Sequence, residues 1–394
     1  MDRTLIFNGR IITPYRTINN GSILVEDGKI ADISEGRLPV SECTTIDAKG
    51  LYVSPGFIDI HTHGGGGFDF MDGTVEAYLG AAIEHAKHGT TALVPTTVTS
   101  TKESLKETFE IYKKAKASKN KGAALLGLHL EGPYFSMEQR GAQDPRYIKN
   151  PEREEYEKIL SWSDDIIRWS AAPELDGAME FGRFLKEKNI LPSIGHSNAI
   201  YEEVIEAFEN GYTHITHLYS GMSGVRRINA YRYAGVIESA FLIDEMTVEI
   251  IADGAHLPSS LLKLIYKIKG PDKIALVTDS MRAAGMPEGE SILGGIRDGQ
   301  KVIVEDGVAK LPDRTAFAGS VATADRLVRT MINIAEVPLI DAVRMMTTTP
   351  AKIMKIDDRK GSIVVGKDAD LVIFDEDINI QTTMVEGEVV YSRQ

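Results

Sequence analysis

Six side chains that can bind a divalent metal stand at or near the ends of short apolar segments in this sequence. Histidine and carboxylate ligands without cysteine suit zinc or iron rather than a structural thiolate site. A divalent metal can supply a nucleophile at neutral pH by lowering the pKa of bound water to about 7. The pattern therefore predicts a centre for a divalent metal. The six residues are His61, His63, Glu131, His196, His217 and Asp279.

His61 and His63 are two residues apart at the end of the segment FIDIHTH. Alternate residues of a strand face the same side, so both imidazoles are expected to point in one direction, where one metal could take both. A single His-x-His is as often a hydrogen-bonded feature of a core. The coincidence of six such positions favours a ligand role.

Four other histidines fit ordinary packing. His85 and His88 are spaced i and i+3 in a helical segment, which is typical of a packed or solvated helix face. His129 faces the same side as Glu131 and is expected behind the ligands rather than among them. His214 is interpreted as a packing residue.

The middle of the chain alternates apolar strands with amphipathic helical segments, and eight strands are expected. Eight parallel strands indicate an α/β fold with a (β/α)8 TIM barrel, here over residues 56–355, in which chemistry sits at the carboxyl ends of the strands. The six candidate ligands end five of the strands. His256, just after the seventh, is expected to contact substrate. The strands are FIDIH, TALVPT, ALLGLHLE, WSAAPE, LPSIGH, HITH, VEIIAD and IALVTD.

Both ends of the chain are rich in short strands and turns. TLIF, SILV and KIADI occur near the start, and GSIVV, DADLVIFD and MVEGEVVY near the finish. Neither set can make a stable core alone, so residues 1–55 and 356–394 are predicted to form one small composite β-sandwich domain.

Composition excludes several classes of partner. The 394 residues carry 44 basic and 57 acidic side chains, a net charge of −13, which disfavours nucleic acid and anionic membranes. The sequence has no long apolar run that would span a bilayer, and its first residues do not resemble a signal peptide. The single cysteine, Cys43, excludes an internal disulfide and suits the cytoplasm, which is the expected location.

Seven motifs together resemble the N-acetylglucosamine-6-phosphate deacetylases of the amidohydrolase superfamily. The likeness covers nearly the whole chain and implies hydrolysis of the acetamide of N-acetylglucosamine 6-phosphate to glucosamine 6-phosphate and acetate. The motifs, in chain order, are GFIDIHTHG, GLHLEGPYF, SIGHSNA, THITHLYSGM, IADGAHLP, LVTDSM and FAGS.

The resemblance also implies two groups of metal ligands. His61, His63 and Asp279 would hold one ion, and Glu131, His196 and His217 the other. Some members of the family lack the His-x-His pair and use one ion, so one or two ions are expected, zinc first and iron as the alternative. Glu131 resembles the family's substitute for a bridging carbamylated lysine. Asp279 would pass the proton of the attacking water to the sugar amine.

Further residues are assigned to the substrate by the same resemblance. Gln143 would touch it near its carbonyl, His256 would contact the sugar, and backbone at Ser220 and Gly221 would hold the phosphate. Arg232 is similar to a family arginine that reaches the phosphate from a neighbouring subunit, which implies a homodimer. The backbone of Phe317, Ala318 and Gly319 would line the sugar pocket.

Two departures from the family pattern leave the substrate open. The family's HLFNAM is His217-Leu218-Tyr219-Ser220-Gly221-Met222 here, and its Arg-Glu-Pro-Gly is Arg232-Tyr233-Ala234-Gly235. A related deacylase, acting on N-acetylgalactosamine 6-phosphate or an N-acyl amino acid, is therefore one alternative. A non-catalytic scaffold protein with an amidohydrolase-like barrel is another.

Overall fold

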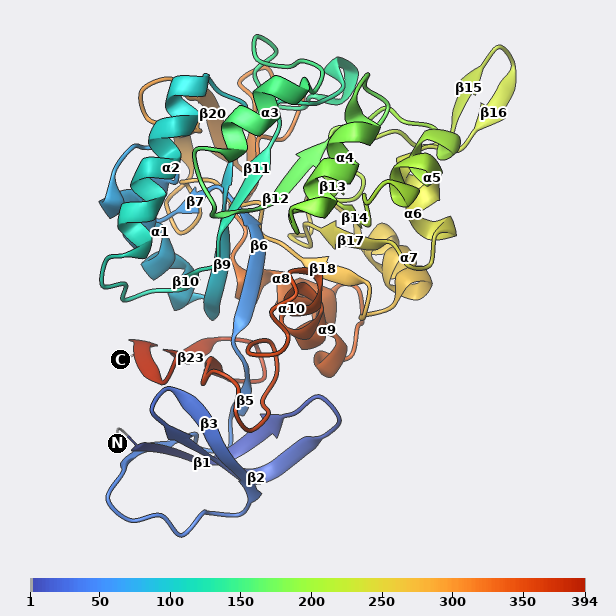
Figure 1. Cartoon of the computed structure of the whole chain (residues 1–394). Coiled ribbons are helices and arrows are strands. Elements are labelled where there is room, and N and C mark those ends of the chain that lie inside the picture. Colours follow the sequence, from blue (N-terminus) through green and yellow to red (C-terminus); the bar gives the residue numbers. More distant parts are fainter. Residues whose placement is uncertain (1–2, 394) are drawn as a thin grey trace.

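A parallel β-barrel occupies the middle of the molecule in the computed structural model, which describes residues 3–393 (Figure 1). Its strands pair in chain order, and between the last and the first of them the Asp279 backbone N–H donates to the His61 carbonyl at 2.9 Å. The predicted TIM barrel is thus confirmed. Its strands are β6 (Phe57–Thr62), β9 (Thr90–Thr97), β11 (Leu128–Glu131), β12 (Ile166–Ala171), β13 (Leu191–Ile194), β14 (His214–Ile215), β17 (Thr247–Ile250) and β18 (Ile274–Leu276).

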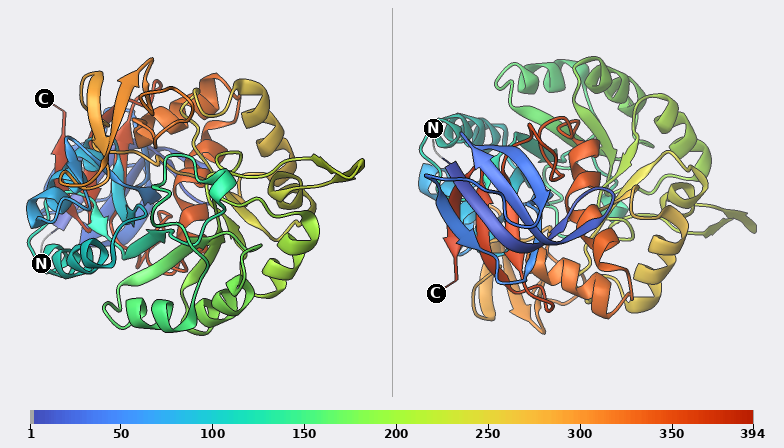
Figure 2. Two further views of the ribbon diagram at one scale, coloured as in Figure 1. Left: turned by 90° about the horizontal axis from the view of Figure 1, so that it is seen from above. Right: turned by 90° about the horizontal axis from the view of Figure 1, so that it is seen from below.

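Helices surround the barrel and cover its outer face (Figure 2). The first of them illustrates why they form: the Thr74 hydroxyl accepts from the Ala77 backbone N–H as an N-cap, and one face buries Tyr78 and Ala81. The helices are α1 (Val75–Lys87), α2 (Lys102–Lys116), α3 (Arg153–Leu160), α4 (Ala178–Glu187), α5 (Tyr201–Glu209), α6 (Val236–Leu242), α7 (Ser259–Lys269), α8 (Ala324–Asn333), α9 (Leu339–Met346) and α10 (Thr348–Ile353).

The barrel interior is not uniform along its axis. Ile58, Val94 and Val277 meet Ala351 of α10 in an apolar cluster. The positions nearer the carboxyl ends of the strands are instead occupied by buried histidine, carboxylate and arginine side chains. The apolar cluster therefore packs beneath the polar layer that lies near the carboxyl ends of the strands.

The two chain ends share one eight-stranded sheet beside the barrel (Figure 1). It has its own apolar core, in which Ile6 and Ile23 pack with Leu371 and Met384. The composite end domain expected from the sequence is present. Its strands are β1 (Arg3–Ile12), β2 (Thr17–Glu26), β3 (Lys29–Glu35), β4 (Thr44–Asp47), β5 (Tyr52–Pro55), β22 (Leu371–Phe374), β23 (Ile380–Val385) and β24 (Glu388–Ser392).

The strand predicted over GSIVV is wrong. Residues 361–365 form a loop that places Ile363 in the end-domain core, and the Gly366 backbone N–H donates to the Ile30 carbonyl at 2.8 Å. Gly361 has φ of 81°, and a β-carbon there would meet the Thr347 carbonyl oxygen at 2.9 Å. Ile363 is thus buried by a turn rather than by strand pairing, whereas Val364 and Val365 are exposed.

Smaller antiparallel sheets lie outside the barrel strands. β15 (Arg226–Ile228) and β16 (Tyr231–Tyr233) form an antiparallel hairpin that stands out from the body of the molecule (Figures 1 and 2). β19 (Gly289–Leu293), β20 (Gln300–Glu305) and β21 (Val308–Lys310) form a second sheet. Among residues 3–393, no helix is both long and apolar enough to cross a membrane.

A buried lysine anchors the loop that leads into the end domain. The side chain of Lys360 is 1% exposed, and its Nζ lies 2.7 Å from Asp370 Oδ2, 2.9 Å from Asp368 Oδ2 and 3.2 Å from Glu386 Oε1. Asp370 is itself buried, and burial raises the pKa of its carboxyl although Lys360 opposes the shift. Lys360 and Asp370 therefore stabilise each other's buried charge.

We predict that Lys360→Met lowers the free energy of unfolding by about 3 to 5 kcal/mol, because it leaves Asp370 buried without its cation. Urea unfolding followed by circular dichroism measures the loss. Lys114→Met, at an exposed position of α2, is the control and should leave the midpoint unchanged. Equal midpoints for both variants would contradict a stabilising role for Lys360.

Candidate metal centre and active site

The six predicted ligands converge at one end of the barrel. His61, His63 and Asp279 have ligand atoms within 4.8 Å of one another, and so do Glu131, His196 and His217. All six are buried. The structure thus brings together residues that are spread over more than half of the chain, in the two groups expected from the sequence.

Glu131 lies between the four histidines. Its Oε1 is 2.9 Å from His217 Nε2, 3.1 Å from His196 Nε2 and 3.7 Å from His61 Nε2. Its Oε2 is 3.3 Å from His63 Nε2. One carboxylate therefore touches both ligand groups, which is the position that a bridging ligand requires.

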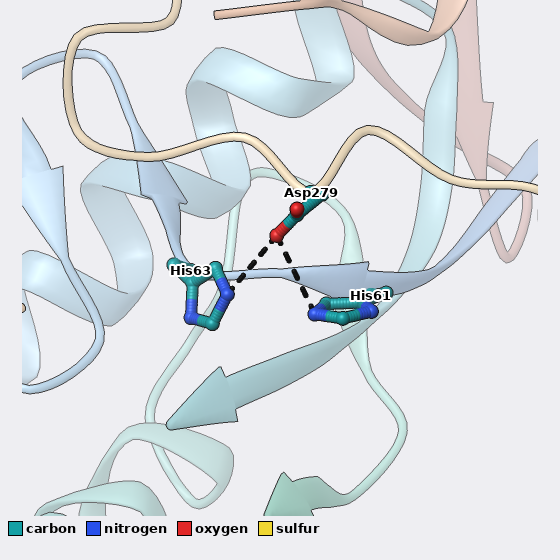
Figure 3. Close-up of side chains that lie close together, drawn as sticks. All are labelled: His61, His63 and Asp279. Carbon is teal, nitrogen blue, oxygen red and sulfur yellow. Dashed lines mark ion pairs between the residues drawn. The ribbon is translucent and has the colours of Figure 1, made fainter. Parts of the chain in front are cut away.

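Asp279 faces the His-x-His pair (Figure 3). Its Oδ1 lies 3.1 Å from His63 Nε2 and 3.4 Å from His61 Nε2. His61 is in β6 and His63 directly follows it, and both rings reach Asp279 from the same side, as the period-two alternation of an extended chain predicts. The carboxylate thus borders the first ligand group and the space above it.

Three of the rings are oriented by an acceptor on the side away from the centre. The His63 Nδ1 atom is 3.2 Å from the Thr96 carbonyl oxygen, and His196 Nδ1 is 2.8 Å from that of Gln139. His61 Nδ1 is 3.1 Å from Glu249 Oε2. With a metal bound, the remaining ring proton would stay on Nδ1 and each Nε2 would offer its lone pair to the ion, which is the arrangement of histidines that bind metals.

The donor set fits a divalent cation. His61 Nε2 is fully buried and has no hydrogen-bond partner among residues 3–393, although it points at two carboxylates. Buried polar atoms without a partner are rare and costly. A cation held by His61, His63, Asp279 and the second group would satisfy this nitrogen.

The electrostatics of the cluster keep both carboxyl groups ionised. Burial alone would raise the pKa of Glu131, but the charge of His61 and hydrogen bonds from His196 and His217 hold it well below its usual range. The pKa of Asp279 is lowered against its burial by His61 and His63. Burial would lower the pKa of His61, yet Asp279 and Glu131 raise it to about 9. The two buried carboxylates thus make the centre favourable for a bound positive charge.

Four ligands lie beyond their strands rather than at the last strand residue, which differs from the sequence prediction. His63 directly follows β6, and the other three lie in turns with left-handed backbone. His196, His217 and Asp279 follow β13, β14 and β18 and have positive φ angles of 48°, 27° and 46°. Side chains other than glycine adopt this left-handed region only when surrounding contacts compensate, and such residues gather at functional sites. The turns redirect the three side chains from the strand axis toward the barrel centre.

A cavity of about 270 Å³ opens above the ligands. Of the predicted substrate residues, six line it: Gln143, Ser220, Gly221, His256, Phe317 and Gly319. Gly221 has φ of 59°, and a β-carbon there would lie 2.7 Å from His196 Nδ1. Glycine at this position therefore lets the loop approach a metal ligand.

The side-chain amide of Gln143 is held in one orientation. Its Oε1 accepts from the Thr99 backbone N–H at 2.8 Å, and its Nε2 donates to Glu131 Oε2 at 2.8 Å. The amide therefore presents its N–H groups, rather than its oxygen, to the space beside Glu131.

His256 is held by Asp253 in the cavity wall. Its Nδ1 lies 2.8 Å from Asp253 Oδ2, and its backbone N–H donates to Asp253 Oδ1 at 2.8 Å. The His256 ring packs on Phe317 with centroids 4.5 Å apart. With the Nδ1 proton directed at Asp253, Nε2 is left as an acceptor for a ligand.

Two predicted substrate residues lie outside the cavity of their own chain. Ala318 is fully buried behind the wall, where its backbone N–H donates to the Ala309 carbonyl at 3.0 Å. Arg232 is exposed on the β15–β16 hairpin, and its Nη1 lies 3.4 Å from the Ala230 carbonyl. The expected loop at this place is a hairpin that carries Arg232 away from the metal centre.

Sequence reasoning missed three polar residues around the centre: Arg168, Glu249 and Asp253. Glu249 and Arg168 are fully buried. One signal was available, since Glu249 interrupts the apolar segment VEIIAD at a position expected to be inside the barrel, where an unpaired charge is not tolerated.

Comparison with known proteins agrees with this geometry. A model of the amidohydrolase family matches residues 52–390. N-acetylglucosamine-6-phosphate deacetylase of Bacillus subtilis (strain 168) is 35% identical over 393 residues, which cover 98% of this chain and 97% of that protein. N-acetylgalactosamine-6-phosphate deacetylase of Escherichia coli O157:H7 is 31% identical over 381 residues, or 96% of this chain and 97% of the relative.

A solved structure is similar over the whole chain. The crystal structure of N-acetylglucosamine-6-phosphate deacetylase from Pasteurella multocida superposes with a TM-score of 0.91 at 31% identity, covering 99% of this chain and all of the other. The barrel, the two ligand groups and these matches lead to one conclusion: the chain belongs to the amidohydrolase family.

Proposed function

We propose that this protein is a metal-dependent deacetylase that hydrolyses the acetamide of N-acetylglucosamine 6-phosphate to glucosamine 6-phosphate and acetate. The observation that carries the proposal is the position of Asp279, which borders both the first ligand group and the cavity. The relatives with this activity cover nearly all of the chain at 30 to 35% identity, which supports the same reaction here.

His61, His63 and Asp279 would hold one ion, and Glu131, His196 and His217 a second, with zinc the expected metal and iron the alternative. A divalent cation bound there supplies Lewis acidity, which activates water at neutral pH and polarises an acyl oxygen. Without thiolate ligands, the buried nitrogens and carboxylates suit this catalytic use.

Asp279 carries the proton transfers. Its lowered pKa keeps it a carboxylate, able to accept the proton of the attacking water. The same carboxyl then donates that proton to the amide nitrogen, so that the C–N bond breaks with a neutral amine as leaving group. An amide anion is too basic to leave without it. One side chain thus serves as general base and then as general acid.

The cavity wall orients the substrate. Gln143 directs its N–H groups toward the acyl oxygen, where charge develops in the tetrahedral intermediate. His256 offers Nε2 to a sugar hydroxyl, and the Phe317 ring beside it provides an apolar surface for the sugar. Backbone at Ser220 and Gly221, where Gly221 has positive φ, forms the side of the cavity that we assign to the phosphate.

A homodimer completes the phosphate site in this proposal. Arg232 is on a projecting hairpin and does not line its own cavity, whereas a guanidinium is well suited to bind phosphate with two hydrogen bonds. The hairpin also exposes apolar Val225 and Tyr231, at 61% and 73%. A second copy of the chain would cover these side chains and receive Arg232. We place the enzyme in the cytoplasm, which its single cysteine suits.

N-acetylgalactosamine 6-phosphate is a second candidate substrate, because a deacetylase of that sugar is also similar over 96% of the chain. Acetate release from both sugar phosphates, from unphosphorylated N-acetylglucosamine and from an N-acetylated amino acid tests the choice. We expect the highest kcat/KM on N-acetylglucosamine 6-phosphate. Equal rates without phosphate would overturn the proposed substrate, and no release from any compound by the metal-loaded protein would favour a non-catalytic role.

We predict that Asp279→Asn lowers kcat by about a hundredfold or more, because the amide cannot take up and return the proton. The barrel should stay folded. Acetate release and circular dichroism measure the two effects, with Asp358→Asn at an exposed site as the control. Turnover near that of the wild type would remove Asp279 from the proton transfers.

We predict that His61→Ala and His196→Ala lose different ions, because the two histidines belong to different ligand groups. Elemental analysis of the purified proteins gives the stoichiometry. His88→Ala serves as the control, since His88 is the C-cap residue of α1 and pairs with Asp325 rather than with the centre. Loss of both ions to the same extent in both variants would contradict two separate groups.

We predict that Arg232→Ala raises KM for the phosphorylated sugar by about tenfold or more, which corresponds to the loss of a charge-assisted hydrogen bond. The unphosphorylated sugar should be unaffected. Arg227→Ala on the same hairpin is the matched control. A parallel fall in kcat/KM for both sugars would show that Arg232 supports the hairpin or the dimer rather than the phosphate.

A further inference from the structure

A buried ion pair lies directly behind the metal ligands. Glu249 of β17 and Arg168 of β12 are both fully buried, and Arg168 Nη1 donates to Glu249 Oε1. The guanidinium also donates to the Ile60 carbonyl at 3.1 Å, to Ser193 Oγ at 3.0 Å and to Thr216 Oγ1 at 2.9 Å. Arg168 is thus held by three other strands, β6, β13 and the end of β14.

The second carboxylate oxygen of Glu249 contacts one residue from each ligand group. It lies 3.1 Å from His61 Nδ1 and accepts from the His217 backbone N–H at 3.2 Å. His217 is one of the ligands with positive φ, so this hydrogen bond falls on a backbone position that needs support. His61 can present Nε2 to a metal only when its proton is on Nδ1, which Glu249 accepts.

We propose that Glu249, held in place by Arg168, is a positioning residue that aligns His61 and His217 together and so links the two ligand groups. This inference rests on the metal centre of the proposed function. The Arg168–Glu249 pair thus positions metal ligands in addition to occupying the barrel interior. Arg168 neutralises the buried charge of Glu249. Glu249 in turn fixes the positions of His61 and His217 relative to the barrel strands.

A purely structural ion pair makes a different prediction, and paired substitutions separate the two. Replacing one partner leaves a buried charge, whereas replacing both with apolar side chains of similar size often restores stability. If the pair only stabilises the barrel, metal affinity should recover together with stability in a double variant. If Glu249 positions the ligands, stability should recover and affinity should not.

The experiment compares Glu249→Gln and the double variant Arg168→Met/Glu249→Leu with the wild-type full-length protein. Zinc affinity is measured on metal-depleted protein by competition with a chromophoric chelator, and the electronic spectrum of bound Co²⁺ reports ligand geometry. We expect affinity about 10 to 100-fold weaker in both variants, with an altered Co²⁺ spectrum. Urea unfolding should show a loss of stability in Glu249→Gln that the double variant regains.

Asp370→Asn is the matched control, because Asp370 is also a buried carboxylate paired with a buried cation but lies in the end domain. It should lower stability and leave zinc affinity unchanged. Wild-type affinity and spectrum in folded Glu249→Gln would overturn the inference, as would recovery of affinity in the double variant. Failure of the wild type to bind any metal would instead overturn the metal centre itself.

Discussion

The organisation of this protein depends on placing the Glu131 carboxylate among four imidazoles inside a barrel. A buried carboxylate is tolerated only with positive or hydrogen-bonding partners, and here each oxygen faces histidine nitrogens from other strands. The partners come from β6, from the residue directly after it and from the turns after β13 and β14, so they can meet only in a closed barrel. Closure of the barrel and assembly of the ligand set are therefore the same event.

The polar side chains behind the ligands also depend on hydrogen-bond partners from other strands. Thr216 Oγ1 is 2.8 Å from Ser170 Oγ, which lies 2.7 Å from His129 Nε2, and His129 Nδ1 is 3.3 Å from Thr96 Oγ1. Thr96 in turn offers its carbonyl to His63. Hydrogen bonds thus connect the inward polar positions of successive strands, and a satisfied network of this kind specifies one arrangement of the barrel core.

The sequence was sufficient to predict the barrel and the convergence of the six candidate ligands, because each of them ends or follows a short apolar run, a local signal. His129 lies behind the ligands, as expected, and His214 is buried, where it contacts Thr247 and Glu249 rather than only apolar neighbours. Glu249 and Arg168 were not found, because their pairing depends on two strands far apart in the chain. The loop at GSIVV was mistaken for a strand because its apolar residues resemble those of a strand. A turn buries Ile363 and leaves Val364 and Val365 exposed, which residue types alone do not reveal. The positive φ angles of His196, His217 and Asp279 likewise depend on contacts after folding.

The shared sheet of the end domain has a consequence for the order in which the protein is made. β5 pairs with β22, with Pro55 opposite Leu371, and the core beneath them needs side chains from both ends of the chain. During synthesis the first 55 residues leave the ribosome long before their partners exist. The apolar face of these residues therefore stays uncovered while the barrel segments are synthesised, until β22, β23 and β24 have been made and can pack against it.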